Sequence, residues 1–414
     1  MEKTISVFGL GYIGLPTAAI FASRRFKVVG VDVDQHAVDT INGGGVHIVE
    51  PDLDMLVQAA VTAGYLRATT TPEPADAFLI AVPTPFKNGH EPDLKYIEAV
   101  SKALAPVLQR GNLVILESTS PVGTTEQLAA WLAAARPDLT FPQTHGDASD
   151  VRIAYCPERV LPGQVVRELV QNDRVIGGLS AKCSDEASAL YKSFVEGECI
   201  ITNARTAEMC KLTENSFRDV NIAFANELSI ICDKLGIDVW ELIRLANRHP
   251  RVNILQPGPG VGGHCIAVDP WFIVSKTPEE ARLIRIAREV NDAKPHWVLE
   301  KIRAAALDQR NPVIACLGLS FKPNIDDLRE SPALEITREV CAMGLGEVLA
   351  VEPFVDELPA ALAGFDNVSL VSAEEALSRA TIAVILVDHA AFAEARMPLM
   401  KHPTVIDTRG MLSR

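Results

Sequence analysis

The sequence predicts an α/β protein with two doubly wound, Rossmann-like domains joined by a long central helix and a helical dimerisation segment. Short β-branched runs alternate with helical patterns up to residue 200, and the alternation returns after residue 305. Strands that alternate with helices favour parallel sheets covered on both faces. Between these regions, residues 204–235 contain neither proline nor glycine, which indicates one long helix. We therefore expect domains at residues 1–200, 201–305 and 306–414.

The first domain is expected to hold buried strands followed by helices. The apolar, β-branched runs that predict its strands are residues 5–9, 28–32, 77–82, 113–118, 152–156 and 174–177. The helix over residues 204–235 would be about 45 Å long at 1.5 Å per residue, too long for one small domain to cover. Such a helix could cross between domains or pack on a second copy of itself.

After Gly236, Asp238 is placed to cap a shorter helix through residue 248. A glycine-rich loop follows, and another helix is expected from about residue 279. The last domain repeats the strand and helix pattern of the first. Its expected strands are residues 313–317, 347–351, 382–387 and 404–407, with a helix over residues 332–343.

Composition limits the partners. The 414 residues are 48% hydrophobic, and 39 Lys and Arg against 53 Asp and Glu give a formal charge of −14. An acidic chain is a poor nucleic-acid coat or polybasic membrane anchor, so we expect neither nucleic acid nor a membrane as partner. The uncharged residues 5–23 have the length of a membrane span, but three glycines and Pro16 fit a strand, a turn and a helix better.

The eight cysteines show neither a Cys-x-x-Cys pair nor a metal-ligand spacing with histidine. Scattered cysteines in a long chain are typical of reduced thiols, so we expect a cytoplasmic protein without a metal site. Their positions are 156, 183, 199, 210, 232, 265, 316 and 341.

The sequence Gly9-Leu10-Gly11-Tyr12-Ile13-Gly14 lies where the first expected strand turns into a helix, and Asp32 ends the next strand. The glycines permit a tight turn and the approach of a pyrophosphate to the helix N-terminus, while the carboxylate accepts hydrogen bonds from a ribose. A purely structural turn is the alternative. Asp32 would repel a 2′-phosphate, so the pattern favours NAD over NADP.

Hydroxyl-rich segments follow two other expected strands, at residues 82–85 and 118–125. Ligands of open α/β sheets bind at the carboxyl ends of strands, so these hydroxyls suit a nicotinamide ribose or a substrate. Serine and threonine that simply cap helices are the alternative.

On the long helix, Lys211, Asn215 and Arg218 recur at helical spacing and share one face. A solvated polar stripe is the alternative. The Lys-x-x-x-Asn pair nevertheless suits oxidation of a carbinol, which needs a donor near the oxygen where negative charge grows.

Residues 258–263 form a loop nearly without side chains that delivers Cys265, with Asp269 four residues later. A cysteine is most often an inert buried residue, but this setting favours a nucleophile, for which His264 could act as base or be merely structural. In the last domain, Lys322 and Arg329 could meet phosphate groups, or be exposed loop cations.

Taken together, these residues resemble the UDP-glucose/GDP-mannose dehydrogenase family over the whole chain. The motifs that carry the resemblance are the N-terminal glycine pattern, residues 118–124, Pro157-Glu158, Lys211 to Asn215, Asn226-Glu227, the glycine-rich segment ending at Cys265, and Phe321-Lys322-Pro323. Ile266-Ala267-Val268-Asp269 after the cysteine departs from the UDP-glucose branch. With residues 249–253 and His264, it resembles the bacterial branch that oxidises UDP-N-acetyl-D-mannosamine for enterobacterial common antigen.

The resemblance implies a four-electron oxidation of the sugar C6 alcohol to a carboxylate, with two NAD, one water and thiohemiacetal and thioester steps on a cysteine. It implies that Cys265 is the nucleophile, Lys211 the donor to the substrate oxygen, Asn215 and Asp269 their supports, and Glu158 and Thr119 candidates to hold the water. The implied cofactor contacts are Gly9, Gly11, Tyr12, Ile13, Gly14, Asp32, Thr84, Thr125 and Arg329. The implied substrate contacts are Arg159, Val160, Lys211, Asn215, Arg218, His249, Arg251, Gly262, Phe321 and Lys322, with Arg251 reaching into the partner of a homodimer.

Three alternatives stay open. The same chemistry could act on UDP-N-acetylglucosamine or UDP-glucose. A two-electron hydroxyacid dehydrogenase also pairs Lys and Asn on a helix after a Rossmann domain. A non-catalytic NAD-bound scaffold or sensor would bind nucleotide without turnover.

Overall fold

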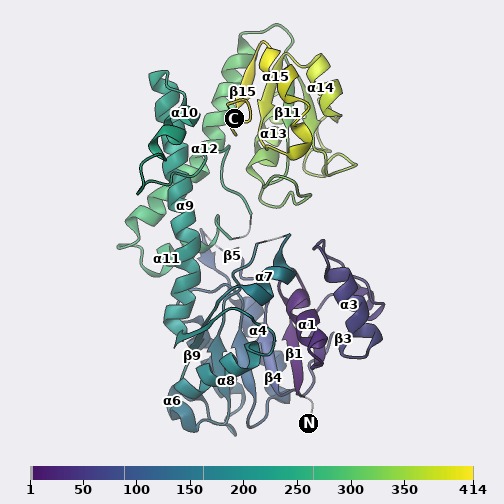
Figure 1. Ribbon diagram of the computed structural model, residues 1–414, viewed down its shortest axis with the longest axis vertical. Helices are drawn as coiled ribbons and strands as arrows, with labels where there is room; N and C mark the ends of the chain where they lie inside the picture. Colours follow the sequence, from purple (N-terminus) through teal and green to yellow (C-terminus); the bar gives the residue numbers. More distant parts are fainter. Residues whose placement is uncertain (1–2, 88, 162, 264, 414) are drawn as a thin grey trace. The chain divides into compact units, whose positions relative to one another are not determined.

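The computed structural model describes residues 3–87, 89–161, 163–263 and 265–413. The chain divides into two compact units, residues 1–214 and 215–414. The long helix α9 (Ala204–Leu235) contributes to both units, and its observed bounds match the expected ones (Figure 1).

The first unit contains an eight-stranded sheet with the order β10-β9-β8-β7-β4-β1-β2-β3. Neighbouring strands run parallel except β8 and β9, which pair antiparallel. The expectation of a fully parallel sheet is therefore wrong at this pair, because apolar strands covered on both faces carry no signal of their direction. The strands are β1 (Thr4–Phe8), β2 (Lys27–Val31), β3 (Leu66–Thr69), β4 (Ala77–Ile80), β7 (Leu113–Leu116), β8 (Arg152–Tyr155), β9 (Arg174–Gly178) and β10 (Cys199–Asn203).

Helices cover both faces of this sheet. Alternate residues of a strand point to opposite faces, so Ile5 and Val7 of β1 join one core while Phe8 joins the other. The first core is closed by α1 (Gly14–Ser23), α2 (Gln35–Asn42), α3 (Leu53–Thr62), α7 (Val165–Gln171) and α8 (Ala181–Tyr191). The second is closed by α4 (Lys95–Leu104) and α5 (Thr124–Ala135). Short elements complete the unit: β5 (Phe86–Lys87), β6 (Glu91–Pro92) and α6 (Pro142–His145).

The second unit contains a five-stranded parallel sheet with the order β13-β12-β11-β14-β15. Its strands are β11 (Val313–Leu317), β12 (Glu347–Val351), β13 (Val368–Leu370), β14 (Ile382–Ile385) and β15 (Val405–Asp407). One face packs on α12 (Arg282–Leu307) and α13 (Pro332–Met343), and the other on α14 (Ala373–Arg379) and α15 (Arg396–Lys401). The helices α10 (Val239–Ala246) and α11 (Asp269–Lys276) precede the sheet.

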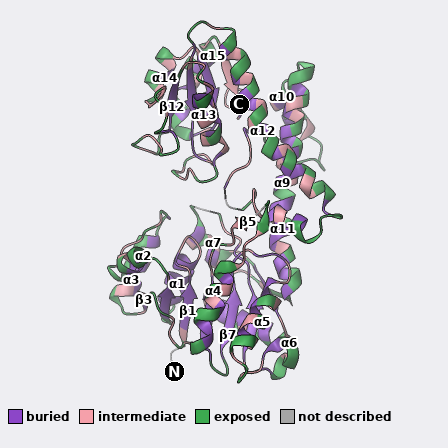
Figure 2. Cartoon of the chain, turned by 180° about the vertical axis from the view of Figure 1, so that it is seen from behind, coloured by how far each residue is buried: buried purple, intermediate pink, exposed green. Residues whose placement is uncertain are grey.

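The two doubly wound sheets and the long helix confirm the predicted fold class. The sequence analysis missed β3, β10 and β13, which lie at sheet edges, and the short strands β5 and β6, which form a separate two-stranded sheet. The residues of β10 and β13 are half-buried or exposed, so these strands lack the continuous buried run of central strands such as β1 and β7, which Figure 2 shows as buried. Among the described residues, no helix combines the length and apolar character needed to span a bilayer.

Candidate active site

The glycine pattern forms the expected tight turn between β1 and α1. Gly9 has φ +85°, and a Cβ atom there would lie 2.6 Å from the carbonyl oxygen of Ala81. A Cβ on Gly14 would lie 1.7 Å from the carbonyl oxygen of Gly9, whereas one on Gly11 would meet nothing within 4 Å. Gly9 and Gly14 are thus required by the fold, and Gly11 leaves open space beside the helix N-terminus where a pyrophosphate can approach.

Asp32 stands at the end of β2 and is partly exposed. Its Oδ2 accepts a 2.7 Å hydrogen bond from the Leu10 N–H, and its Oδ1 accepts one of 3.0 Å from the Asp34 N–H. These bonds fix the carboxylate next to the glycine turn. The Thr84 hydroxyl, after β4, is buried and has no hydrogen-bond partner among the described residues. An orphaned buried hydroxyl at a strand end and a fixed carboxylate fit a dinucleotide with its two riboses.

The hydroxyls of residues 118–125 divide into two groups. Those of Ser118, Ser120 and Thr124 donate to the backbone carbonyls of Ile80, Ser118 and Pro121, so the fold engages them, but none of them caps α5. Thr119 is half-buried, and no hydrogen bond of its hydroxyl is found within the described part of the chain. Of these four residues, only Thr119 therefore keeps its hydroxyl for a ligand.

Thr125 is held by a residue that the sequence analysis missed, Glu208 of α9. Glu208 Oε1 accepts from the Thr125 N–H at 2.8 Å and from its hydroxyl at 2.6 Å, while Oε2 accepts from the Gly123 N–H at 2.6 Å. Helix α5 begins after Gly123, which has no side chain to cap it. Glu208 supplies that cap from another helix, and its burial raises the pKa of its carboxyl. Its place one turn before Lys211 was the only available sequence signal.

Glu158 belongs to a buried charged cluster. Arg174 of β9 donates to Glu158 Oε2 at 2.7 Å, and the Arg159 N–H donates to Oε1 at 2.6 Å. The Arg174 guanidinium lies over the Tyr191 ring, and the Tyr191 hydroxyl donates to Glu117 Oε1. Burial raises the pKa of Glu117 to about 7. Arg174 therefore fixes Glu158. The sequence analysis missed Arg174, because it belongs to no recognisable motif.

Helix α9 presents Lys211 and Asn215 as buried side chains, one turn apart, whereas Arg218 is exposed. The solvated-stripe alternative is thus wrong for the first two residues and holds for Arg218. Lys211 has no ion pair among the described residues, so its ammonium group remains available to an oxygen of a ligand.

The glycine-rich loop is fastened to α9 at both of its ends. Asn226 Oδ1 accepts from the Gly258 N–H at 2.9 Å, and Asn215 Nδ2 donates to Asp269 Oδ2 at 2.5 Å. Asn215 and Asn226 are about three helical turns apart on one face of α9. Cys265, four residues before Asp269, is exposed, whereas the other seven cysteines are buried or half-buried. None of the eight forms a disulfide within the described residues. Burial raises the pKa of Cys156 and Cys316 to about 12, which keeps those thiols protonated. His264 lies outside the described residues.

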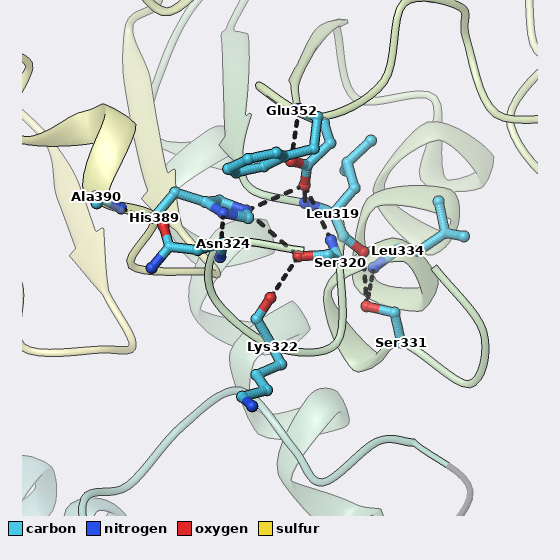
Figure 3. Close-up of polar contacts among 10 residues, drawn as sticks. Leu319, Ser320, Lys322, Asn324, Ser331, Leu334, Glu352, His389 and Ala390 are labelled. Atoms are coloured by element: carbon cyan, nitrogen blue, oxygen red, sulfur yellow. Dashed lines mark hydrogen bonds and ion pairs between the residues drawn. The ribbon is translucent and has the colours of Figure 1, made fainter. Parts of the chain in front are cut away.

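The loop after β11 brings Phe321 to the glycine-rich loop. A Cβ on Gly262 would lie 3.1 Å from the Phe321 Cβ, and one on Gly263 would lie 3.0 Å from its ring. Only residues without side chains allow this contact. The same loop holds Lys322, whose side chain extends away from the polar cluster around Ser320 and Glu352 (Figure 3). The structure thus brings Gly262, Phe321 and Lys322 into one region of the second unit.

The remaining predicted contacts are cations on the surface or in ion pairs. Arg159 pairs with Glu214 at 2.6 Å, and Arg329 pairs with Asp327 at 2.6 Å. His249 and Arg251 are exposed, with the Arg251 N–H donating to His249 Nδ1 at 3.3 Å. Val160 packs at the border of the first core. Arg409, which the sequence analysis missed, pairs with Asp388 and lies within 2.7 Å of a Cβ built on Gly258.

Comparisons with known proteins agree with this architecture. Models of the UDP-glucose/GDP-mannose dehydrogenase family match with the NAD-binding domain at residues 3–195, the central domain at 205–293 and the UDP-binding domain at 315–414. The chain is 69% identical to an NDP-N-acetyl-D-galactosaminuronic acid dehydrogenase of Ralstonia nicotianae, covering 99% of this chain and 96% of that relative. It is 65% identical to a UDP-N-acetyl-D-mannosamine dehydrogenase of Yersinia pestis, covering 99% of each.

Among solved structures, a UDP-D-ManNAc dehydrogenase from Pyrococcus horikoshii is similar with a TM-score of 0.88 and 40% identity, covering 99% of this chain and 96% of that one. A UDP-N-acetyl-mannosamine dehydrogenase from Staphylococcus aureus is similar with a TM-score of 0.86 at 40% identity, with the same coverage. Three family models together match most of the chain, and the relatives extend over nearly its whole length. The chain therefore belongs to the UDP-glucose/GDP-mannose dehydrogenase family of NAD-dependent oxidoreductases.

Proposed function

We propose that this protein oxidises the C6 alcohol of UDP-N-acetyl-D-mannosamine to the carboxylate. The observation that carries the proposal is Cys265, the one cysteine that is exposed and not buried or half-buried, on a loop that α9 holds at both ends. NAD supplies the oxidising chemistry, with each of two NAD⁺ molecules accepting one hydride. One alcohol, one water and two NAD⁺ therefore give one carboxylate, two NADH and three protons.

Each protein group has a defined task in this reaction. The Cys265 thiolate adds to the aldehyde carbon, and Lys211 donates to the oxygen that becomes the hydroxyl of the thiohemiacetal. Asn215 and Asp269 fix the helix and the loop that carry these two groups. The thiohemiacetal is then oxidised to a thioester, and a water held by Thr119 and Glu158 cleaves it to return the thiol. Both Glu158 oxygens already accept one hydrogen bond each, and a carboxylate oxygen has a second lone pair for the water.

We assign NAD to residues 1–200 and the UDP-sugar to residues 306–414, with residues 201–305 carrying Lys211, Asn215 and the Cys265 loop. The proposed cofactor contacts are the residues of the glycine turn, three residues at or after strand ends, and one arginine of the last domain. They are Gly9, Gly11, Tyr12, Ile13, Gly14, Asp32, Thr84, Thr125 and Arg329. Arg159, Val160, Arg218, His249, Arg251, Gly262, Phe321 and Lys322 are the proposed substrate contacts.

The choice of N-acetylmannosamine is supported by a run of relatives with 64–65% identity that carry this name. A second candidate is a nucleotide-linked N-acetyl-D-galactosamine, because the Ralstonia relative is 69% identical. The two sugars are both N-acetylhexosamines that differ in ring stereochemistry. We further propose that the uronate serves bacterial polysaccharide synthesis, such as enterobacterial common antigen, in the cytoplasm.

We also propose a homodimer that forms through α9. Phe217, Phe224 and Ile231 are 69%, 53% and 43% exposed and recur every seven residues, the spacing of a helix-pairing seam. Replacing Phe217 with Glu should give monomers in a sedimentation experiment. Leu307→Glu is the matched control, because Leu307 at the end of α12 is 66% exposed and should leave the dimer intact. A wild-type protein that sediments as a monomer would refute the dimer.

The test of the reaction is the NADH yield per sugar with the UDP derivatives of N-acetylmannosamine, N-acetylgalactosamine, N-acetylglucosamine and glucose. We expect two NADH per molecule of UDP-N-acetylmannosamine and the highest kcat/KM with that sugar. Cys265→Ser should stop the reaction before the carboxylate forms, while Cys183→Ser, at a buried cysteine of the first unit, should not. One NADH per sugar that is unaffected by Cys265→Ser would indicate a two-electron dehydrogenase, and binding of NAD without turnover of any sugar would indicate a scaffold.

A further inference from the structure

The second unit repeats the β1–β2 geometry of the first in β11 and β12. Gly9 and Gly318 have φ +85° and +90°, and their N–H groups donate to the last residue of the neighbouring strand, Val31 at 2.9 Å and Val351 at 2.8 Å. A carboxylate then follows each neighbouring strand. Asp32 accepts from the Leu10 N–H at 2.7 Å, and Glu352 accepts from the Leu319 N–H at 2.8 Å.

The two carboxylates have different surroundings. Asp32 is partly exposed, as a ribose-binding carboxylate must be. The Glu352 side chain is fully buried, and its Oε2 accepts from the Leu319 and Ser320 N–H groups and contacts His389 Nε2 at 3.1 Å. The Phe354 N–H donates to Oε1 at 3.2 Å. Glu352 is therefore directed into its own loop and, unlike Asp32, has no exposed side-chain surface for a ligand.

His389 holds the other end of this loop. The Asn324 N–H donates to His389 Nδ1 at 3.0 Å, so Nδ1 is unprotonated and Nε2 carries the hydrogen that faces Glu352 (Figure 3). Asn324 adopts φ +63°, and its Oδ1 accepts from the Ala390 N–H at 2.8 Å. Glu352 thus fixes residues 319 and 320, while His389 and Ala390 fix residue 324.

The segment between these two fixed points carries Phe321 and Lys322. The Ser320 hydroxyl donates to the Lys322 carbonyl at 2.8 Å, and Phe321 contacts the glycine-rich loop at Gly262 and Gly263. Lys322 itself extends outward from the cluster (Figure 3). The polar cluster therefore fixes the backbone from which the Lys322 side chain extends.

We propose that Glu352 and His389 are positioning residues for the UDP-sugar: they set the conformation of residues 318–324 so that Phe321 and Lys322 meet the nucleotide sugar. The proposal rests on the proposed function, since it assumes that this loop binds substrate. Glu352 occupies the position in the second unit that Asp32, the proposed ribose-binding carboxylate, occupies in the first. There, together with His389, it shapes a loop.

Histidine variants can separate the two contacts. His389→Asn keeps an acceptor near Nδ1 for the Asn324 amide, and His389→Gln keeps a donor near Nε2 for Glu352. We expect His389→Asn, His389→Gln and Glu352→Gln each to raise the KM for the UDP-sugar about tenfold. Calorimetry should show UDP binding weakened by the same factor, which is the effect of roughly one lost hydrogen bond. The double loss in His389→Leu should cost about a hundredfold, while the KM for NAD stays within about twofold of wild type.

His402→Gln is the matched control, because both ring nitrogens of His402 contact backbone carbonyls, Thr404 at 2.9 Å and Ala380 at 3.0 Å, in the same unit. It should leave UDP binding unchanged. Unchanged UDP affinity in folded His389→Asn and His389→Gln overturns the proposal, as does an equal loss in His402→Gln. Failure of the proposed function has a different signature, namely a wild-type protein that binds UDP but forms no NADH from any of the UDP-sugars.

Discussion

Replacing Glu208 with alanine should destabilise the first unit, because this side chain caps α5 from outside the helix. The change removes the acceptor of three hydrogen bonds, from the Gly123 N–H, the Thr125 N–H and the Thr125 hydroxyl. Thr125 is fully buried, so its amide would lose its partner away from water. A net hydrogen bond to a charged group contributes about 1.5–3 kcal/mol, and an orphaned buried donor costs a similar amount.

Part of the stabilisation by these hydrogen bonds is offset, since burying the Glu208 carboxylate is unfavourable. The same desolvation raises the pKa of Glu208. We therefore expect Glu208→Ala to lower the free energy of unfolding by about 3 kcal/mol, a large part of the roughly 5–15 kcal/mol of a typical domain. Glu208→Gln keeps one acceptor oxygen and should lose about half as much.

Urea denaturation followed by circular dichroism measures the change, and an NAD titration tests the proposed contact of Thr125 with the cofactor. Glu126→Ala is the matched control, because Glu126 also lies in the first turn of α5 and pairs with Arg205 of α9 at 2.7 Å, but the two side chains are 41% and 65% exposed. An exposed ion pair contributes about 0–1 kcal/mol. Equal losses in Glu208→Ala and Glu126→Ala would refute the idea that Glu208 is the cap of α5.

Three further changes test the buried polar groups. The raised pKa of Glu117, about 7 against an ordinary value of 4.5, means that the folded state binds a proton that the unfolded state releases between these pH values, so stability falls as pH rises from 4.5 to 7. In urea denaturation, the free energy of unfolding of wild type should fall by about 3 kcal/mol relative to that of Glu117→Gln over this range. If the free energies of unfolding of the two proteins change with pH in parallel, the raised pKa of Glu117 is contradicted. Burial lowers the pKa of Lys294 from 10.5 to about 7, so stability should rise with pH between these values relative to Lys294→Met; a flat difference between the two proteins would argue against it. Asn215→Ala should lower kcat more than it raises the KM for NAD, since it frees the Asp269 end of the Cys265 loop, whereas Asn221→Ala, at a half-buried position of the same helix whose amide donates only to the Phe217 carbonyl among the described residues, should match wild type in steady-state kinetics.

The fold class, the central strands and the residues with a chemical signature could be predicted from the amino-acid sequence. Central strands appeared as apolar runs, the bounds of α9 followed from the absence of proline and glycine, and the turn at Gly9 to Gly14 was fixed by its spacing. These features are local, because backbone geometry and capping depend on a few neighbouring residues. The strands β3, β10 and β13 were not predicted because exposed or half-buried positions interrupt their apolar runs.

Which polar groups are engaged within the protein, and which remain for a ligand, could not be predicted without the folded structure. Gly123 and Glu208 are 85 positions apart, Tyr191 and Glu117 are 74 apart, and His389 and Glu352 are 37 apart. Thr119 and Ser120 are neighbours in one motif, yet the fold uses the hydroxyl of Ser120 and leaves that of Thr119 without a protein partner among the described residues. A hydrogen bond needs donor and acceptor within about 3 Å at a suitable angle, and packing of distant segments brings them there.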